Sequence, residues 1–441
     1  MSITQYTLDS NSTSYPAETA QDTLYASAYS NVNDKPDFKY VFDVYANGNQ
    51  LTRVKLYPDP VNGFGYFDAG PSVRNEMNYE WFTAQAYTNA TNPGIQESLI
   101  TEPSQTGQIA INYDIRFGEE YISGGVYVSG SYVSGGTLVT LLNEVSGTKK
   151  VYNYAAPLFN RKSIRISDLN NKYLTNRPKK ANCKLNGNLL IPIKLPANSN
   201  KYIGFKIIQY NQANTSFDTF SSQIDGPFYS ALCNEFYQLN IGPSALNILL
   251  DSAGKNTISN QCKFYDIAIE DTDTGNAISE YFRVYIDCNP KYDAIDLYFM
   301  NQWGMFDTAR FDLSSRLSMD IERKSFTKKD WNLVSDNINY FPRQETKINY
   351  GSKMNWTYKL TMNYPTDEEY VWLSELITSP QIYAKFPEVN DFNGIVTNAT
   401  ISLMPVTIKN TNYEYSTNQN NGLKVLEIEV ELNQTRYGFL R

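Results

Sequence analysis

The feature that most constrains the fold is a repeated alternation of apolar and polar side chains with a period of two. Residues 109–117 place an isoleucine, tyrosine or phenylalanine at every second position, and residues 426–432 alternate aliphatic side chains with Glu427, Glu429 and Glu431. Successive side chains of a β-strand point to opposite faces of the sheet. Each segment therefore predicts a strand with one buried face and one polar face.

Residues 39–57 predict a β-hairpin. Aromatic and β-branched residues dominate both halves, and Asn47-Gly48 lies between them. This dipeptide readily adopts the positive φ angles that a tight hairpin turn needs. Further strand patterns bounded by turn residues occur at 189–195, 202–210, 264–269 and 281–287. The prediction is a mainly β protein.

The composition predicts a folded chain with several domains. Of 441 residues, 14% are aromatic and only 19% are charged, whereas disordered chains show the opposite bias. With about 150 residues per domain, this length suits roughly two to four domains. We predict an extended polar arm at 1–35, a β-sandwich domain at 36–150, a second β-sandwich at 151–290 and a C-terminal β-rich domain at 291–441.

The C-terminal domain is predicted to contain one helix, at about 367–378. Thr366 and Glu369 have the spacing of a capping box, four apolar residues downstream recur at helical spacing, and Pro380 prevents much continuation. Strand patterns before and after the helix give a β-α-β-β-β order. After Phe311, and before these elements, the sequence has the composition of a more charged connector.

Residues 121–136 repeat short aromatic and β-branched pieces separated by Ser-Gly. Glycine at this density weakens a strand, because it supplies no side chain to pack. Two interpretations remain open: a surface hairpin, and a flexible loop or weak ribbon that orders against a partner.

The chain contains no histidine, which excludes Ser-His-Asp triads, Cys-His dyads and histidine-liganded metals. The cysteines are widely spaced and form no C-x-x-C motif, so we expect reduced, buried thiols and no zinc site. They are Cys183, Cys233, Cys262 and Cys288. No metal or cofactor is predicted.

Two acidic motifs favour a structural interpretation. Glu119 and Glu120 are neighbours in a strand and so point to opposite faces, whereas glycosidase carboxylates face each other across a substrate. Residues 271–276 begin like a calcium loop, but Phe282 stands where the closing glutamate is required, so a β-turn between strands is favoured. No catalytic, cofactor-binding or metal-binding residue is assigned, and the chain is predicted not to be an enzyme. A glycosidase whose carboxylates meet only in the folded chain remains an alternative.

The net charge is -8 and the isoelectric point is near 4.9. This balance argues against a general nucleic-acid binder, because affinity for phosphate backbones comes from clustered lysine and arginine. Residues 1–6 have neither the basic start nor the apolar core of a secretion signal, and no run approaches the roughly 20 apolar residues of a membrane span. We expect synthesis in a cytoplasm and no membrane insertion.

Residues 297–311 read Leu-Tyr-Phe-Met-Asn-Gln-Trp-Gly-Met-Phe-Asp-Thr-Ala-Arg-Phe. Together with six other segments, and in the same order, this string resembles recurring segments of structural proteins from tailed phages of Bacteroidetes hosts, the crAss-like phages included. The resemblance spans about 36–433, and the Ser-Gly stretch at 121–136 departs from it. The six other segments are 36–48, 54–60, 115–121, 172–178, 279–288 and 368–383.

This resemblance implies a virion tail or portal–tail connector component whose last domain is similar to the strand-helix-strand tail-tube or hub type. The expected protein is a non-enzymatic subunit that forms a homo-oligomeric ring or hub around the DNA channel and contacts other tail, ring or portal proteins. Genomic DNA is expected to pass without specific binding. The expected location is the virion tail, and the host cytoplasm during assembly. Residues 1–35 and 121–136 are candidate contacts with neighbouring subunits.

Two alternatives stay open at this level. Glu427, Glu429 and Glu431 face either a lumen, where carboxylates repel the DNA backbone, or bulk solvent as an ordinary polar strand face. The whole protein is alternatively a receptor- or glycan-binding adhesin or fibre protein, which uses exposed tyrosine and tryptophan to stack on sugars.

Overall fold

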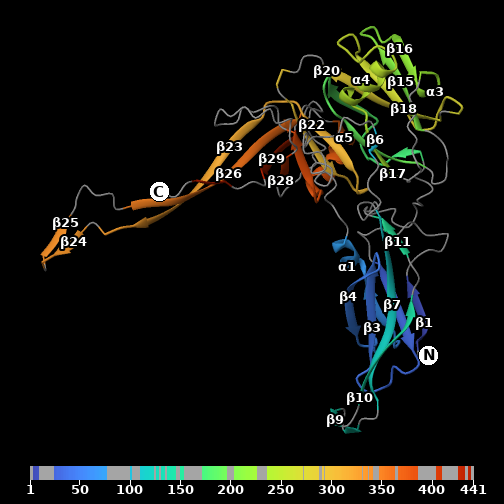
Figure 1. Ribbon diagram of the computed structural model, residues 1–441, viewed down its shortest axis with the longest axis vertical. Coiled ribbons are helices and arrows are strands. Elements are labelled where there is room, and N and C mark those ends of the chain that lie inside the picture. The colour runs from blue at the N-terminus through green and yellow to red at the C-terminus, as the bar shows by residue number, and fades with distance from the viewer. Residues whose placement is uncertain are drawn as a thin grey trace. The chain divides into compact units, whose positions relative to one another are not determined.

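The prediction of a mainly β chain is confirmed by the computed structural model shown in Figure 1. The chain forms two compact units: unit 1 comprises Met1–Ala90, Gln96–Ile286 and Met300–Asp307, and unit 2 comprises Thr91–Ile95, Asp287–Phe299 and Thr308–Arg441. The structure describes residues 3–8, 24–76, 100–101, 110–123, 126–128, 131–134, 137–145, 149–152, 171–195, 203–225, 236–271, 273–287, 291–292, 294–329, 331–335, 337–340, 347–362, 366–385, 404–409, 426–432 and 436–438.

The first part of unit 1 contains two sheets that share one apolar core. One sheet has the order β1-β2-β5 and the other β10-β7-β3-β4, with β11 also paired to β7. Side chains of β2, β3, β7 and helix α1 meet in the core. The elements are β1 (Ile3–Leu8), β2 (Tyr25–Ser30), β3 (Lys39–Ala46), β4 (Asn49–Leu56), β5 (Gly65–Asp68), α1 (Gly70–Asn75), β7 (Ala110–Ser123), β10 (Thr137–Val145) and β11 (Lys149–Tyr152).

The predicted hairpin at 39–57 is confirmed. β3 and β4 pair antiparallel, and the turn residues Asn47 and Gly48 have φ angles of 48° and 85°. Both angles lie in the left-handed region that this dipeptide adopts readily. The buried stripe predicted around β7 is confirmed from residue 111 onward, where four alternate side chains are at most 2% exposed: Ile111, Tyr113, Ile115 and Phe117.

The N-terminal residues differ from the extended arm expected at 1–35. β1 and β2 pair antiparallel within the chain, and β2 also pairs with β5. Ala26, Ala28 and Ser30 are at most 1% exposed, so one face of β2 packs into the core. Alanine and serine give only a weak hydrophobic pattern, which hides the period of two in the sequence. Residues 9–23 of the expected arm lie outside the described residues.

The Ser-Gly segment forms strands wherever it is described. β7 ends at Ser123, and β8 (Val126–Val128) pairs with β9 (Ser131–Ser134) in a sheet of two strands. β10 then returns antiparallel to β7, with Thr137 opposite Ser123. The described strands of the segment thus pair antiparallel, as the hairpin interpretation expects, and ordering of the segment against a partner stays a prediction.

The second part of unit 1 again has two sheets around one core. Their orders are β12-β14-β17-β6 and β13-β20-β18-β15-β16, and β19 pairs with β18. Side chains from both sheets and from helix α4 form the core. The elements are β6 (Ile100–Thr101), β12 (Lys172–Tyr173), β13 (Lys180–Lys184), β14 (Leu190–Lys194), β15 (Ile203–Tyr210), β16 (Ser216–Ser221), α3 (Ser222–Asp225), β17 (Phe236–Asn240), α4 (Pro243–Ser252), β18 (Phe264–Asp271), β19 (Asn276–Ala277) and β20 (Phe282–Asp287).

Helix α4 was not expected from the strand-and-turn pattern of 151–290. Gly242 precedes it and Pro243 lies in its first turn, where the missing N–H of proline leaves no intrahelical bond unmade. Leu246, Leu249 and Leu250 are at most 2% exposed, so the helix buries one face in the core. The Gly-Pro start and the helical spacing of these leucines are the signals for it in the sequence.

Unit 2 has a main sheet with a helix packed against it, and a second sheet of two strands, β24 and β25. The order of the main sheet is β22-β21-β27-β28-β29-β26-β23, and β30 pairs with β26. Residues Met300–Asp307, which include the connection from β21 to β22, belong to unit 1. The elements are β21 (Ile295–Met300), β22 (Phe306–Phe311), β23 (Arg316–Thr327), β24 (Trp331–Val334), β25 (Asn337–Tyr340), β26 (Lys347–Met362), α5 (Asp367–Thr378), β27 (Ile382–Lys385), β28 (Met404–Ile408), β29 (Leu426–Leu432) and β30 (Arg436–Gly438).

Helix α5 confirms the predicted helix at 367–378. The Thr366 hydroxyl accepts a hydrogen bond from the Glu369 N–H at 3.3 Å, and the Glu369 carboxylate accepts one from the Thr366 N–H at 2.8 Å. This reciprocal pair satisfies two donors at the start of the helix. Trp372, Leu373 and Leu376 are buried in the core that the helix shares with the sheet. The succession β26, α5, β27, β28, β29 confirms the predicted β-α-β-β-β order.

Candidate assembly surface

Strands β23 and β26 form a long antiparallel ribbon in unit 2. All twelve residues of β23 have a partner in β26, from Arg316 opposite Lys359 to Thr327 opposite Lys347. β29 pairs with β26 only from Thr357 to Met362, so the ribbon continues past the main sheet of its unit (Figure 1). The interpretation of this region as a charged connector is therefore wrong for residues 316–327.

One face of the ribbon is apolar. Directly opposite residues share a face of a sheet, and three such pairs place six apolar side chains together. The members on β23 are between 37% and 40% exposed. Exposed apolar patches on soluble proteins mark interaction sites. The pairs are Leu317 with Tyr358, Met319 with Trp356 and Ile321 with Met354.

Further exposed apolar side chains lie toward the tip of the ribbon, on the face opposite to Leu317, Met319 and Ile321. After a register shift between Lys324 and Ser325, Phe326 lies opposite Ile348. Phe326 is 48% exposed, and its ring centroid is 6.2 Å from that of Tyr350, which is 42% exposed. The exposed surface is therefore not limited to the base of the ribbon.

The same face of the sheet is covered by α5 closer to the centre of unit 2. Leu360 and Met362 follow Tyr358 on alternate positions of β26, and both belong to the core formed with Trp372 of α5. Tyr358 packs at the edge of that core. The apolar face of the ribbon is thus a continuation of the core face beyond the helix.

The opposite face of the sheet is polar, and its charges alternate in sign. Lys359 Nζ lies 2.8 Å from the Glu427 carboxylate. Lys409 Nζ donates a hydrogen bond to Thr357 Oγ1 at 2.9 Å and lies 3.6 Å from the Glu431 carboxylate and 3.7 Å from Asp320. The acidic row of β29 is therefore flanked by lysines.

The alternation predicted for 426–432 is confirmed in β29. Leu426, Ile428 and Val430 are buried, whereas Glu427 and Glu429 are exposed. The buried side chains belong to the core with α5, and the glutamates lie on the polar face.

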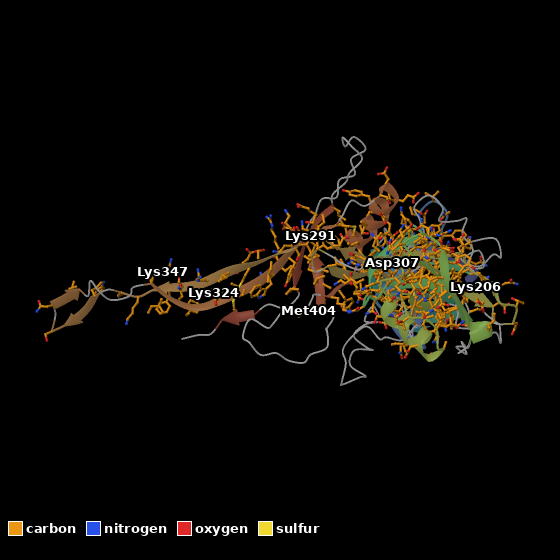
Figure 2. All side chains as sticks on the ribbon, turned by 90° about the horizontal axis from the view of Figure 1, so that it is seen from above. Lys206, Lys291, Asp307, Lys324, Lys347 and Met404 are labelled. Atoms are coloured by element: carbon orange, nitrogen blue, oxygen red, sulfur yellow. The ribbon has the colours of Figure 1, made fainter. Side chains whose placement is uncertain are left out.

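The outer part of the ribbon carries basic side chains without acidic partners. Residues 323–329 and 347–353 contain six lysines or arginines and no acidic residue. Within the part of the chain that the structure describes, no carboxylate forms an ion pair with any of them. Figure 2 labels two of them, Lys324 and Lys347, along the ribbon. The six are Arg323, Lys324, Lys328, Lys329, Lys347 and Lys353.

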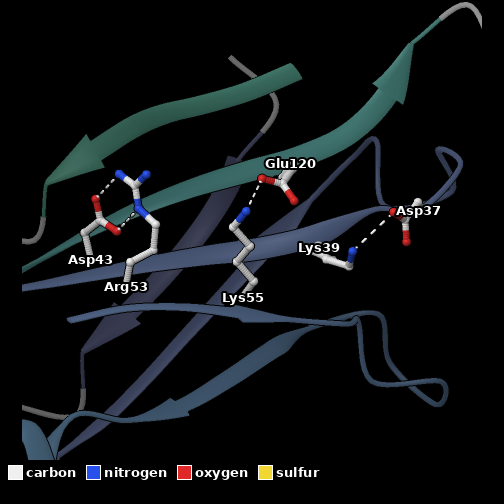
Figure 3. Close-up of polar contacts among 6 residues, drawn as sticks. All are labelled: Asp37, Lys39, Asp43, Arg53, Lys55 and Glu120. Atoms are coloured by element: carbon white, nitrogen blue, oxygen red, sulfur yellow. Dashed lines mark hydrogen bonds and ion pairs between the residues drawn. The ribbon is translucent and has the colours of Figure 1, made fainter. Parts of the chain in front are cut away.

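The adjacent glutamates of β7 have structural partners in unit 1. The Glu119 carboxylate accepts a hydrogen bond from Ser30 Oγ at 2.9 Å, whereas Glu120 pairs with Lys55 Nζ at 2.6 Å (Figure 3). Glu119 lies opposite Tyr40 of the core, and Glu120 lies opposite Lys39. The prediction that they point to opposite faces is confirmed, so they do not form a carboxylate pair across a substrate.

Two further ion pairs join neighbouring strands or turns beside Glu120. The fully buried Asp43 carboxylate accepts hydrogen bonds from Arg53 Nε at 2.7 Å and Nη2 at 2.6 Å, and this bonding raises the pKa of Arg53. Lys39 Nζ lies 3.2 Å from Asp37 in a more exposed position (Figure 3). These charges hold the sheet in register rather than forming an open acidic site.

Asp271 and the described residues 273–276 form the turn that the sequence predicts. The Asp271 carbonyl accepts hydrogen bonds from the N–H groups of Thr274 at 3.2 Å and Gly275 at 2.8 Å. The Asp271 side chain accepts one from the Asp273 N–H at 3.0 Å, and Gly275 has a φ of 68°. The turn connects β18 to β19.

Neither the cysteines nor the acidic side chains of the described residues form a metal site. Cys183 and Cys262 are buried and form no disulfide, as expected, and Cys233 and Cys288 lie outside the described residues. Over the described ranges, no three side chains of cysteine, aspartate or glutamate gather into a group that could hold a metal ion.

The distinctive segment 297–311 forms β21, β22 and their connection. In unit 1 the Gln238 side chain donates to the Phe306 carbonyl at 2.8 Å and accepts from the Phe306 N–H at 3.0 Å. The Thr175 hydroxyl donates to the Asp307 carboxylate at 2.6 Å. Asp307 and the backbone of Phe306 thus have structural roles, and Gln238 is a partner that sequence reasoning missed.

No protein-family model matches the chain, and no curated protein has a significantly similar sequence. None of the helices that the structure describes is both long and apolar enough to span a membrane.

Proposed function

We propose that this protein is a structural subunit of a phage tail or portal–tail connector, and that its copies form a ring or hub around the DNA channel. The observation that carries the proposal is the apolar face of the β23–β26 ribbon, whose β23 side chains are 37–40% exposed and whose β26 side chains are half-buried. Water-exposed apolar surface is destabilising by about 25 cal/mol for each Å² that a partner would bury. Packing of a second chain against the ribbon buries this surface and stabilises the complex by this free energy.

The fold supports the same proposal. Each part of unit 1 has two sheets on a shared core, which supports our proposal that both parts are β-sandwiches. In the described part of unit 2, a helix lies between two strands of the main sheet, as we propose for a domain of the tail-tube or hub type. The ribbon then extends from that domain toward a neighbouring subunit.

A non-enzymatic role is part of the proposal. The carboxylates that first suggested acid–base chemistry each have a structural partner, Ser30 for Glu119 and Lys55 for Glu120. The proposed partners are copies of the same chain and other tail, ring or portal proteins, while genomic DNA passes without specific binding. The proposed location is the virion tail, after assembly in the host cytoplasm. Residues 1–35 and 121–136 remain candidate secondary contacts.

The polar face with Glu427, Glu429 and Glu431 leaves two placements in such a ring. Facing the lumen, these carboxylates repel DNA and help it slide; facing solvent, they are an ordinary strand surface. Replacing all three by lysine and measuring DNA ejection from assembled particles separates the two. Slower ejection supports the lumen, and unchanged ejection supports the solvent placement.

The proposal is tested by the assembly state of the purified full chain. Light scattering gives its mass, and negative-stain electron microscopy of the same sample shows its shape. Closed rings, or a monomer that forms rings when a candidate portal or tail protein is added, support the proposal. A stable monomer or trimer that ignores such partners contradicts it.

A second candidate function is a receptor- or glycan-binding adhesin, and a row of four aromatic rings on β2 and around β5 favours it. Neighbouring ring centroids are 5.0 Å apart for Tyr29 and Phe64, 6.0 Å for Phe64 and Tyr66, and 5.8 Å for Tyr66 and Tyr25. Tyr25 and Tyr66 are 38% and 37% exposed. Binding of host polysaccharide that Tyr25→Ala/Tyr66→Ala abolishes would support this function.

A further inference from the structure

We propose that the ribbon docks head to tail on a second copy of this chain, with its apolar face buried and its basic outer part against an acidic surface of that copy. This inference rests on the proposed function and names the partner of the ribbon. It is carried by the exposed apolar face together with the distribution of charge along the chain.

Charge is divided unequally between the ribbon and the remainder of the chain. Residues 316–362 contain nine basic and five acidic side chains, whereas the other residues contain 29 basic and 41 acidic ones. The ribbon segment is therefore net positive within a chain that is net negative elsewhere. Opposite charges on two surfaces speed their encounter and fix their orientation.

This distribution disfavours two ribbons packed face to face. A twofold contact would bring the same basic side chains of two ribbons together, including Lys324 and Lys347 at its outer part (Figure 2). Like charges at an interface oppose association. The ribbon of one copy against the acidic remainder of the next avoids this repulsion.

The edge strand of the ribbon, β23, also suits a head-to-tail contact between copies. Among the described strands, β23 pairs only with β26, so its second edge is available to a strand of another chain. Each copy then offers one ribbon and one acceptor surface. Repetition of such a contact closes into a ring when the rotation between copies allows it.

The experiment compares full-length variants by sedimentation velocity over a range of protein and salt concentrations. Lys324→Glu/Lys347→Glu reverses two exposed ribbon charges, and Lys172→Glu/Lys180→Glu reverses two exposed charges of unit 1 as the matched control. We expect the ribbon variant to self-associate at least about tenfold more weakly than the parent chain. The control adds the same negative charge to the acidic remainder of the chain, so it should associate no more weakly than the parent chain. Salt should weaken assembly of the parent chain more than assembly of the ribbon variant.

A second variant tests the apolar face and the direction of the contact. Met319→Ser/Ile321→Ser changes two side chains that are 40% and 39% exposed, so the fold should persist, and its far-ultraviolet circular dichroism is the check. We expect this variant alone to remain monomeric. Labelled variant copies should still join assemblies of the parent chain, because their acceptor surface is intact.

The outcomes separate the two proposals. If the parent chain assembles and both ribbon variants assemble as well as it does, the docking inference is overturned. The proposed function then still stands. Exclusion of the serine variant from parent assemblies overturns the head-to-tail direction. A parent chain that stays monomeric with candidate portal and tail proteins overturns the proposed function. A monomer whose ribbon charges instead bind a short DNA duplex assigns the ribbon to nucleic acid and overturns the inference.

Discussion

The side-chain amide of Gln238 bonds both backbone groups of Phe306, which lies 68 residues later in the chain: Nε2 donates to the carbonyl oxygen at 2.8 Å, and Oε1 accepts from the N–H at 3.0 Å. Gln238 is 2% exposed. The amide therefore replaces water at two backbone groups, as a neighbouring strand would.

Gln238→Ala should lower the free energy of unfolding by about 2–4 kcal/mol, because two buried hydrogen bonds to the Phe306 backbone are lost together. Urea denaturation of the full chain measures the change. The control is Gln50→Ala in β4, an exposed position where we expect a change within about 0.5 kcal/mol. Equal effects of the two substitutions would contradict the assigned role of Gln238.

We expect the folded chain to lose stability in alkaline solution, where Tyr173 ionises. Burial raises the pKa of Tyr173 to about 12, while its hydrogen bond with Ser279 Oγ at 3.2 Å acts in the opposite direction. In the unfolded chain this phenol ionises near pH 10, about 2 pH units below its pKa in the folded chain. The neutral phenol therefore makes its full contribution to the free energy of unfolding below about pH 10. That contribution is lost as pH rises toward 12.

Tyr173→Phe removes this ionisation and provides the comparison. The free energy of unfolding of the parent chain minus that of the variant should fall by about 2–3 kcal/mol between about pH 9 and 12. Urea denaturation of both proteins at several pH values measures it. A difference that stays constant over this range would show that Tyr173 ionises alike in the folded and unfolded chains.

Thr366→Ala should destabilise unit 2 by about 1 kcal/mol, because the hydroxyl that accepts the Glu369 N–H is removed from the start of α5. Thr366→Ser keeps the hydroxyl and should stay close to the parent protein. Calorimetric unfolding of the three proteins measures the effect. Equal destabilisation by alanine and serine would point to lost packing of the threonine methyl group instead of a lost cap.

The elements predicted correctly from sequence are those specified by neighbouring residues. Asn47-Gly48 determines the β3–β4 turn, the Thr366 and Glu369 pair determines the start of α5, and period-two alternation determines the faces of β7 and β29. In each case the signal lies within about ten residues and agrees with the surrounding fold.

The elements that were missed depend on context or on distant residues. In β23, Leu317, Met319 and Ile321 follow a period of two, but the charges between and after them resemble a solvated connector. β2 was missed because alanine and serine form its buried face. The contact of Gln238 with Phe306 depends on strand pairings that no local pattern contains.

Arg53→Met should destabilise the first part of unit 1 by about 2–3 kcal/mol. Arg53 lies directly opposite Asp43, whose side chain is 0% exposed, and the substitution keeps the methylene packing while removing both donors from a buried carboxylate. Breaking a buried pair from one side commonly costs about 3–5 kcal/mol, and the 42% exposure of Arg53 lets water compensate part of it.

Lys39→Met is the matched control, because Lys39 and Asp37 are 22% and 34% exposed and such a pair contributes less than about 1 kcal/mol. Asp43→Leu/Arg53→Met should recover most of the loss, since an apolar pair leaves no buried charge. Urea denaturation of the four proteins measures these differences, and equal effects of Arg53→Met and Lys39→Met would contradict the burial argument (Figure 3).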